Sequence, residues 1–189
     1  MTKKANTFSG LPSRGATTMI VKVVAAALLG VLGLFQVSAA RSAAADETSA
    51  PPDIEQIRAV ITLYAKALDR RDYESLRRVF TADATGNYHE AGSYKGVDAL
   101  MDLMQRALSQ CAGTQHLLGS MDVEVHGDVA TASTYLQAIH VGKNPGFEGK
   151  LLTIWGEYRD ELVRTPQGWR ISSRELKTIH AEGDIGMKL

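Results

Sequence analysis

The chain has 189 residues, of which 21 are basic, 21 are acidic and 44% are hydrophobic. The charges are unevenly placed, because residues 1–45 hold no acidic residue, which leaves residues 46–189 with 16 basic against 21 acidic side chains and a formal charge of −5. An acidic domain is a poor match for nucleic acid, whose phosphates need a basic face. The single cysteine, Cys111, excludes an internal disulfide.

Residues 1–45 have the pattern of a secretory signal peptide. Basic residues precede an apolar run from Val23 to Val37, and the small residues that follow suit a cleavage site. We therefore expect an exported protein, periplasmic or secreted, with no membrane attachment after cleavage. The alternative is a retained anchor, since the apolar run is nearly long enough to span a bilayer if tilted. Residues 46–52 form a polar linker that contains two prolines.

Three amphipathic helices are predicted after the linker. Apolar residues recur at three- and four-residue spacing over 54–69, with Asp53 placed as the N-cap. Asp72 is placed to cap a second, short helix that runs through Phe80. The third helix is predicted over 97–109, and its apolar stripe consists of Leu100, Leu103, Met104 and Leu108.

The hydrophobic period then changes from helical to alternating. Strands are predicted over 84–90, 114–126, 129–142, 150–164 and 169–180. Helices followed by antiparallel hairpins predict an α+β fold with the helices on one face of a sheet. Alternate residues from Ala130 to His140 are mostly small, which leaves room for a cavity inside a curved sheet.

Four stretches of the sequence, taken together, form the pattern of a known family. They are YAKALDRRDYESLRRVFTADATGNY, GTQHLLGS, QAIH and GEYRDELVRTPQGWRISSRELK. Together they resemble the SnoaL-like branch of the nuclear transport factor 2-like superfamily, in the pattern of scytalone dehydratase. The resemblance covers nearly all of residues 53–180. It implies a cone-shaped α+β fold in which three N-terminal helices pack on a strongly curved antiparallel sheet that encloses a pocket. Residues 53–189 are therefore treated as one SnoaL-like domain.

The resemblance also implies a site in which an Asp–His dyad transfers a proton without a metal or an organic cofactor. Carried over by position, the dyad is Asp69 and His116. The substrate-binding candidates are Tyr64, Leu68, Tyr88 and His140. Scytalone dehydratase has a tyrosine at the position of Leu68, so one substrate contact differs and scytalone is not the expected substrate.

The residues support this dyad apart from the resemblance. Asp69 falls in the last turn of the first helix, where its charge opposes the helix dipole unless a cation or a hydrogen-bond donor meets it. An imidazole would satisfy the carboxylate and leave its other ring nitrogen free for proton transfer. Strict alternation puts His116 on the polar side of its strand. The pairing therefore requires a β-bulge at Gly119 that turns His116 and Leu118 to the apolar side.

The other histidines have simpler interpretations. His89, His126 and His180 fit a structural or surface role, and His140 suits a pocket donor and an ordinary hydrogen-bonded histidine equally well. The sequence has no His-x-His or H-E-x-x-H spacing, so no metal site is expected.

Two hypotheses of function follow. The first is a cofactor-independent lyase or isomerase of the dehydratase type, which acts on a hydrophobic cyclic small molecule. The second is a non-catalytic module on the same fold that binds a small ligand or serves in assembly. Apolar residues on both faces of the strands over 150–180 also predict a homodimer or homotrimer formed through the outer face of the sheet.

Overall fold

The structure is a computed structural model, which describes residues 51–88 and 91–189. The predicted signal peptide, most of the linker and His89 lie outside the described residues. Within the described ranges, no helix is both long enough and apolar enough to cross a membrane.

The three predicted helices are present as α1 (Asp53–Arg70), α2 (Tyr73–Arg77) and α3 (Val97–Ser109). The bounds of α3 agree with the prediction, and the backbone N–H of Ser75 donates to the Asp72 carboxylate at 3.0 Å, as expected of an N-cap. The second helix is shorter than predicted. It ends at Arg77, because Phe80 already begins the first strand of the sheet.

Asp53 has a different role from the predicted one. Pro52 occupies the N-cap position of α1 without a side-chain cap, and Asp53 is the first helical residue. Its carboxylate accepts two hydrogen bonds from Arg164, at 2.7 and 2.6 Å, and a third from the indole N–H of Trp169 at 3.2 Å. Asp53 therefore fastens the start of α1 to the last two strands, which sequence spacing alone does not reveal.

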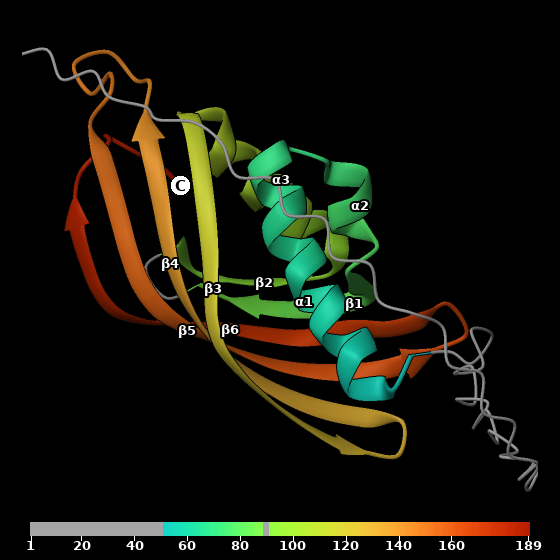
Figure 1. Ribbon diagram of the computed structural model, residues 1–189. Helices are drawn as coiled ribbons and strands as arrows, with labels where there is room; N and C mark the ends of the chain where they lie inside the picture. Colours follow the sequence, from blue (N-terminus) through green and yellow to red (C-terminus); the bar gives the residue numbers. More distant parts are fainter. Residues whose placement is uncertain (1–50, 89–90) are drawn as a thin grey trace, which may run out of the picture. The chain divides into compact units, whose positions relative to one another are not determined.

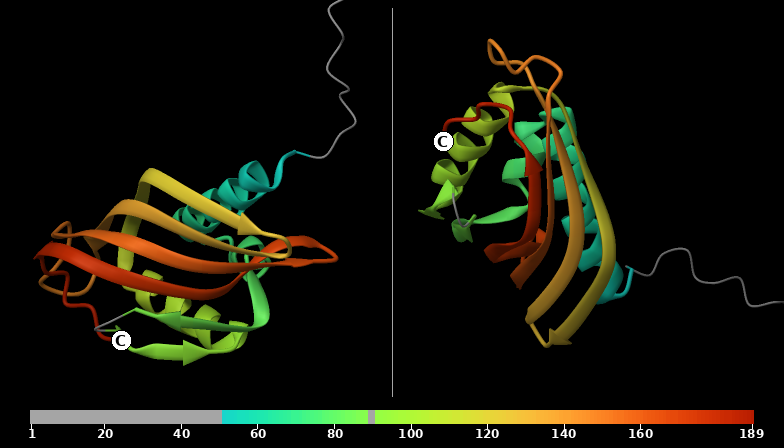
Figure 2. Two further views of the ribbon diagram at one scale, coloured as in Figure 1. Left: turned by 90° about the horizontal axis from the view of Figure 1, so that it is seen from below. Right: turned by 90° about the vertical axis from the view of Figure 1, so that its left-hand side faces the viewer.

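A single six-stranded sheet forms the other layer, in the order β2-β1-β6-β5-β4-β3 (Figure 1). The strands are β1 (Phe80–Asn87), β2 (Ser93–Lys95), β3 (Cys111–His126), β4 (Val129–Gly142), β5 (Leu151–Thr165) and β6 (Gly168–Gly183). The long strands bend strongly, and the helices lie on one face of the sheet (Figures 1 and 2). The predicted α+β fold is confirmed.

One strand pair departs from the antiparallel pattern. β1 runs parallel to β6, while every other neighbouring pair is antiparallel. Parallel neighbours need a long crossover connection. Here the crossover consists of β2, α3 and the three strands β3, β4 and β5, so this pairing joins the two ends of the domain.

The predicted bulge in β3 is present. The pairing of β3 with β4 shifts register between Leu118 and Met121, which brackets Gly119. As a result the His116 side chain is only 6% exposed, while Leu117 on the opposite face is 59% exposed. Leu118 packs against the core. The insertion of one residue thus reverses the strict alternation, as the resemblance requires.

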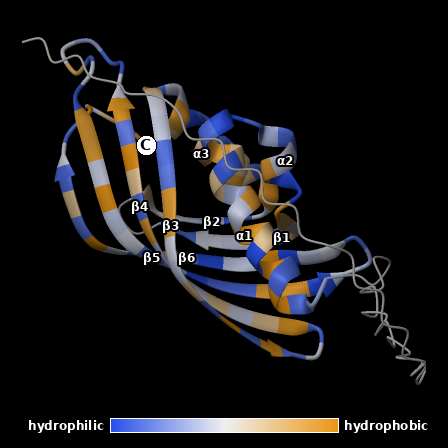
Figure 3. Cartoon of the chain, in the orientation of Figure 1, coloured by the Kyte–Doolittle hydropathy of each residue, from blue (hydrophilic) through white to orange (hydrophobic). Residues whose placement is uncertain are grey.

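The core lies between the helices and the inner face of the sheet. Apolar positions alternate with polar ones along the strands and around α1 (Figure 3). The fully buried side chains of α1 include Ile57 and Ile61, which meet Leu162 and Ile171 from β5 and β6 in one cluster. The inward residues of β4 are small, so this part of the inner face leaves space above it.

Candidate active site

The structure brings Asp69 and His116 into direct contact. The end of α1 places the Asp69 carboxylate against the bulged strand β3, where Oδ1 lies 2.7 Å from Nδ1 of the His116 ring. The backbone N–H of His116 donates to Oδ2 at 2.9 Å, and the Thr114 hydroxyl donates to Oδ1 at 3.1 Å. Three donors from one strand therefore fix the carboxylate and, through it, the orientation of the ring.

These contacts decide the charge of Asp69. Burial raises its pKa, but the hydrogen bonds from the ring and backbone of His116, the charge of His116 and the Thr114 hydroxyl outweigh burial, and the pKa lies below the ordinary 3.8. Asp69 is therefore ionised at neutral pH and can only accept at Nδ1. The Nδ1 atom of His116 then carries the proton, and Nε2 is the basic ring nitrogen.

A cavity of about 400 Å³ lies over the small residues of β4. Tyr64, Leu68, Tyr88, His116 and His140 all line it, so five of the six predicted site residues share one space. Asp69 does not line the cavity and contacts the His116 ring from behind. The apolar walls come from α3, from the long strands and from the C-terminal residues, and include Leu103, Met104, Leu136, Ile154, Leu176 and Met187.

Phenol groups gather at one end of the cavity. The Tyr64 and Tyr88 hydroxyls lie 3.3 Å apart, and the Tyr158 ring packs edge-on against Tyr64 with 5.6 Å between centroids. Burial, together with the neighbouring Tyr64, raises the pKa of Tyr88 and of Tyr158 well above its ordinary value. Both phenols therefore keep their protons and are available as hydrogen-bond donors.

A buried ion pair supports these phenols. Arg174 on β6 donates two hydrogen bonds to the Asp160 carboxylate on β5, each 2.6 Å long, and both side chains are 0% exposed. The guanidinium carbon lies 3.9 Å from the Tyr64 ring centroid and 4.2 Å from that of Tyr158. Sequence reasoning missed Tyr158, Asp160 and Arg174. The alternation of the predicted strand over 150–164 could have placed Tyr158 and Asp160 on the inner face beside Ile154.

His140 differs from His116 in its electrostatics. Burial and the charge of His116 lower its pKa from 6.5 to about 4, so the ring is neutral at neutral pH. The two histidine rings meet edge to face with 5.5 Å between centroids. The Nδ1 atom of His140 is buried and has no hydrogen-bond partner among the described residues. A polar atom left unpaired beside a cavity is a natural contact for a ligand.

The other described histidines lie on the surface. The His126 side chain is 73% exposed, and His180 is an exposed residue that stacks on Trp155 with 5.4 Å between ring centroids. In the described ranges, no three His, Cys, Asp or Glu side chains come together as metal ligands.

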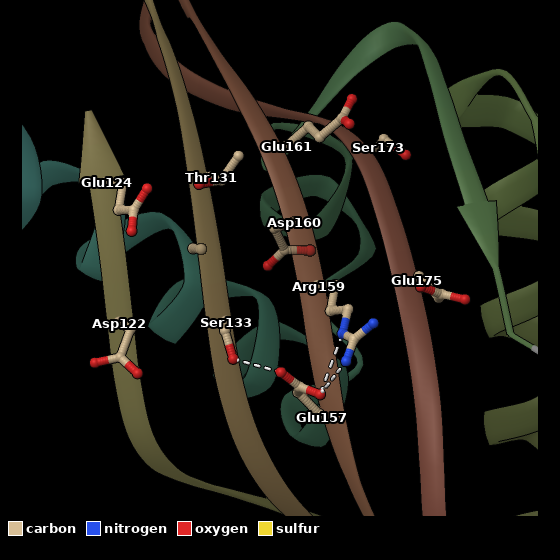
Figure 4. A pocket seen from close by; sticks show the side chains of 11 residues that line it. Asp122, Glu124, Thr131, Ser133, Glu157, Arg159, Asp160, Glu161, Ser173 and Glu175 are labelled. Atoms are coloured by element: carbon tan, nitrogen blue, oxygen red, sulfur yellow. Dashed lines mark hydrogen bonds and ion pairs between the residues drawn. The ribbon is translucent and has the colours of Figure 1, made fainter. Parts of the chain in front are cut away.

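A second hollow, of about 450 Å³, lies on the outer face of the sheet (Figure 4). It contains none of the predicted site residues, and most of its lining residues carry charged or hydroxyl side chains. Its acidic lining residues are Asp122, Glu124, Glu157, Asp160, Glu161 and Glu175. The Asp160 carboxylate accepts hydrogen bonds from Arg174. The Glu157 carboxylate accepts hydrogen bonds from Ser133 and Arg159 (Figure 4).

Comparison with known families identifies the fold. The family model described as a SnoaL-like domain matches residues 50–175, which is more than half of the chain. The chain belongs to the SnoaL-like family. This SnoaL-like protein is 35% identical over 123 residues to the uncharacterized proteins Rv2910c of Mycobacterium tuberculosis and Mb2934c of Mycobacterium bovis, and each match covers 63% of this chain and 80% of the relative.

Solved structures agree with this assignment. Kfla4162 from Kribbella flavida superposes with a TM-score of 0.64 at 25% identity, over 69% of this chain and 93% of that one. A Novosphingobium aromaticivorans protein assigned provisionally as a scytalone dehydratase also gives 0.64, at 23% identity over 69% and 87%. The type 3 hexachlorocyclohexane dehydrochlorinase LinA of Novosphingobium barchaimii gives 0.60, at 16% identity over 72% and 91%. The last two likenesses concern the fold.

Proposed function

We propose that this SnoaL-like protein is a cofactor-independent lyase or isomerase of the dehydratase type that acts on a hydrophobic cyclic small molecule. One observation carries the proposal: Asp69 holds the His116 ring by Nδ1 at 2.7 Å, and that ring lines an apolar cavity. The arrangement leaves Nε2 as the base for a molecule bound there. The protein assigned as a scytalone dehydratase and the dehydrochlorinase LinA are named for eliminations, which supports the same class of reaction.

The cavity supplies a group for each part of an elimination. Nε2 of His116 takes a proton from the carbon next to a carbonyl group, while the Tyr88 and Tyr64 phenols hydrogen-bond the carbonyl oxygen as it gains negative charge. The electron pair of the broken C–H bond forms a C=C bond, and the β C–O bond breaks. The leaving hydroxyl takes the proton from the imidazolium and departs as water. Asp69 stabilises the imidazolium between the two steps. An isomerase would instead return the proton to another carbon.

The lining also restricts the charge of the substrate. No lysine or arginine belongs to the described lining of the cavity, and Asp184 is an acidic member of it. A carboxylate or phosphate group would lose its hydration there without a cationic partner, which is costly. The substrate is therefore an uncharged ring system with a carbonyl or hydroxyl oxygen that the phenols and His140 can meet.

The second candidate, a small-ligand-binding module, is favoured by one feature. The predicted signal peptide in residues 1–45 would export the protein, and an exported location is unusual for a biosynthetic dehydratase. The two candidates differ in whether His116 moves a proton, so a proton-transfer assay separates them.

The test is hydrogen exchange at the α-carbons of 2-tetralone, an uncharged bicyclic ketone, followed by NMR in deuterated buffer. The wild-type protein is expected to accelerate exchange over buffer, and His116→Ala is expected to lose at least about 100-fold of that rate. Asp69→Asn is expected to lose most of the rate with little change in ketone binding, because an amide can hold the ring in the wrong tautomer. The matched control is His126→Ala, since this histidine is exposed.

Melting temperatures of all four proteins accompany the rates. If His116→Ala and Asp69→Asn exchange the ketone protons as fast as wild type per folded molecule, the dyad is structural. The binding-module alternative would then take its place.

A further inference from the structure

The last six residues of the chain, Asp184–Leu189, form one wall of the cavity. This C-terminal strap follows the end of β6 and runs back beside α3 (Figure 2). Asp184, Met187 and Leu189 line the cavity, as do apolar side chains of α3. Ile185 is 0% exposed and anchors the strap in the protein. Part of the cavity wall is therefore a segment that belongs to no helix or strand.

Two side-chain amides hold the strap in place. Gln110, at the end of α3, donates to the Lys188 carbonyl at 2.8 Å and accepts from the Lys188 N–H at 2.9 Å. Asn144, in the β4–β5 loop, donates to the Gly186 carbonyl at 3.0 Å. Asn144 also lies 3.3 Å from the Gln110 side-chain oxygen. Gln110 and Asn144 thus satisfy backbone groups of the strap that a neighbouring strand would satisfy in a sheet. We call these two residues the latch.

A glycine stands on each side of the anchor Ile185: Gly183 ends β6, and Gly186 lies within the strap. Gly183 and Gly186 have φ angles of 89° and 62°, values that residues with a side chain rarely adopt. A Cβ atom at Gly186 would lie 2.5 Å from the Phe147 ring, so the close approach of the loop also requires glycine there. Residues Met187–Leu189 therefore follow a glycine pivot. They are held by the hydrogen bonds between Gln110 and Lys188, which are exposed to solvent.

We propose that Met187–Leu189 is the gate of the cavity, and that Gln110 and Asn144 are the residues that set how often it opens. The gate turns about Gly186 while Ile185 stays buried. Its opening breaks the exposed hydrogen bonds between Gln110 and Lys188, and the part-buried hydrogen bond from Asn144 to the Gly186 carbonyl sets the position of the pivot. The proposal rests on the proposed function only in taking the cavity as the ligand site. The same hydrogen bonds hold the gate shut in the free protein and in the ligand complex. Weakening them therefore raises the rate constants of ligand entry and of ligand exit together.

The test is stopped-flow fluorescence with prodan, an uncharged naphthyl ketone that brightens in apolar surroundings. The double variant Gln110→Ala/Asn144→Ala is expected to raise both the association and the dissociation rate constants about tenfold, as the loss of two or three hydrogen bonds implies. Its Kd is expected to stay within about threefold of wild type. The matched control is Gln105→Ala, an exposed glutamine on the same helix, which should leave both rate constants unchanged.

A chain that ends at Gly186 provides the second variant, because it keeps Ile185 and removes the gate. It is expected to bind with rate constants at least as fast as the latch variant and with a weaker Kd, since Met187 and Leu189 no longer contact the ligand. Wild-type rate constants in a latch variant of unchanged melting temperature would overturn the gate, as would the absence of prodan binding to all four proteins. Failure of ketone exchange alone would leave the gate standing and overturn only the proposed reaction.

Discussion

The ion pair between Asp160 and Arg174 offers the sharpest test of how the phenol end of the cavity is held. Both side chains are 0% exposed, and the two hydrogen bonds between them measure 2.6 Å. Burial works against the guanidinium charge, but the attraction of Asp160 and its hydrogen bonds outweigh burial and raise the pKa of Arg174. Each charge is therefore tolerated in the interior only because the other is present.

Removing one partner leaves the other as an uncompensated buried charge. We expect Asp160→Leu and Arg174→Met each to lower the free energy of unfolding by about 3–5 kcal/mol. Arg174→Met should lie at the upper end, because it also removes the guanidinium from the rings of Tyr64 and Tyr158. The double variant should recover most of the loss and lie within about 2 kcal/mol of wild type, since an apolar pair needs no compensation. It also removes the Nη1 atom of Arg174, which is buried without a hydrogen-bond partner among the described residues.

The assay is urea unfolding at pH 7 followed by circular dichroism. A matched control is the pair of Arg77 and Asp98, whose contact measures 2.7 Å but whose side chains are 47% and 88% exposed. Arg77→Met should cost less than about 1 kcal/mol. A loss of less than about 1 kcal/mol in either single variant at Asp160 or Arg174 would contradict a mutually dependent buried pair, as would a double variant that loses the sum of the two single losses.

Three further predictions concern other parts of the molecule. Because the pKa of His140 falls from 6.5 to about 4 on folding, the unfolded chain binds the proton first as the pH drops, and wild type should lose up to about 3 kcal/mol of stability between pH 6.5 and pH 4. Urea titrations across this range should show a flatter profile for His140→Gln, and an equal acid slope would contradict the buried neutral ring. Leu117 and Tyr135 are 59% and 56% exposed on the outer face of the sheet, so the protein should be a dimer or trimer there, and Tyr135→Glu should dissociate it; light scattering that finds a wild-type monomer at micromolar concentration would count against this interface. N-terminal sequencing of the exported protein should find a mature chain that begins near Ala40 or Asp46, and an intact Met1 would exclude cleavage.

Local rules predicted the parts of this fold that depend on neighbouring residues. The Asp72 cap and the bounds of α3 follow from residues within one or two helical turns. The bulge at Gly119 was required only because the family pattern demanded that His116 face inward, since a glycine in a strand does not by itself place a bulge. The contact between Asp69 and His116 followed from the same pattern.

The features that the sequence did not reveal all depend on strand register across the sheet. Asp160 and Arg174 are direct partners in the β5–β6 ladder, but a register shift between Glu161 and Leu162 intervenes between them and the hairpin turn, so counting from the turn does not pair them. The parallel contact of β1 with β6 joins residues almost ninety positions apart. The role of Asp53 likewise depends on Arg164, which the last hairpin brings to the start of α1.

Two charge pairs lie next to the cavity, Asp160 with Arg174 and Asp69 with His116. They differ in burial, and this difference gives them separate roles in the proposed reaction. Beside the phenols, Asp160 and Arg174 are both fully buried and neutralise each other, so this pair adds no net charge next to the Tyr64 and Tyr88 hydroxyls. At the dyad, Asp69 keeps 25% of its side chain exposed, and in the proposed reaction its partner His116 takes up and releases a proton. In the proposed reaction, the dyad therefore transfers the proton and the phenols polarise the carbonyl group. A substrate bound with its carbonyl group turned away from the phenols would lack their hydrogen bonds to the oxygen as it gains negative charge, and should bind without reacting.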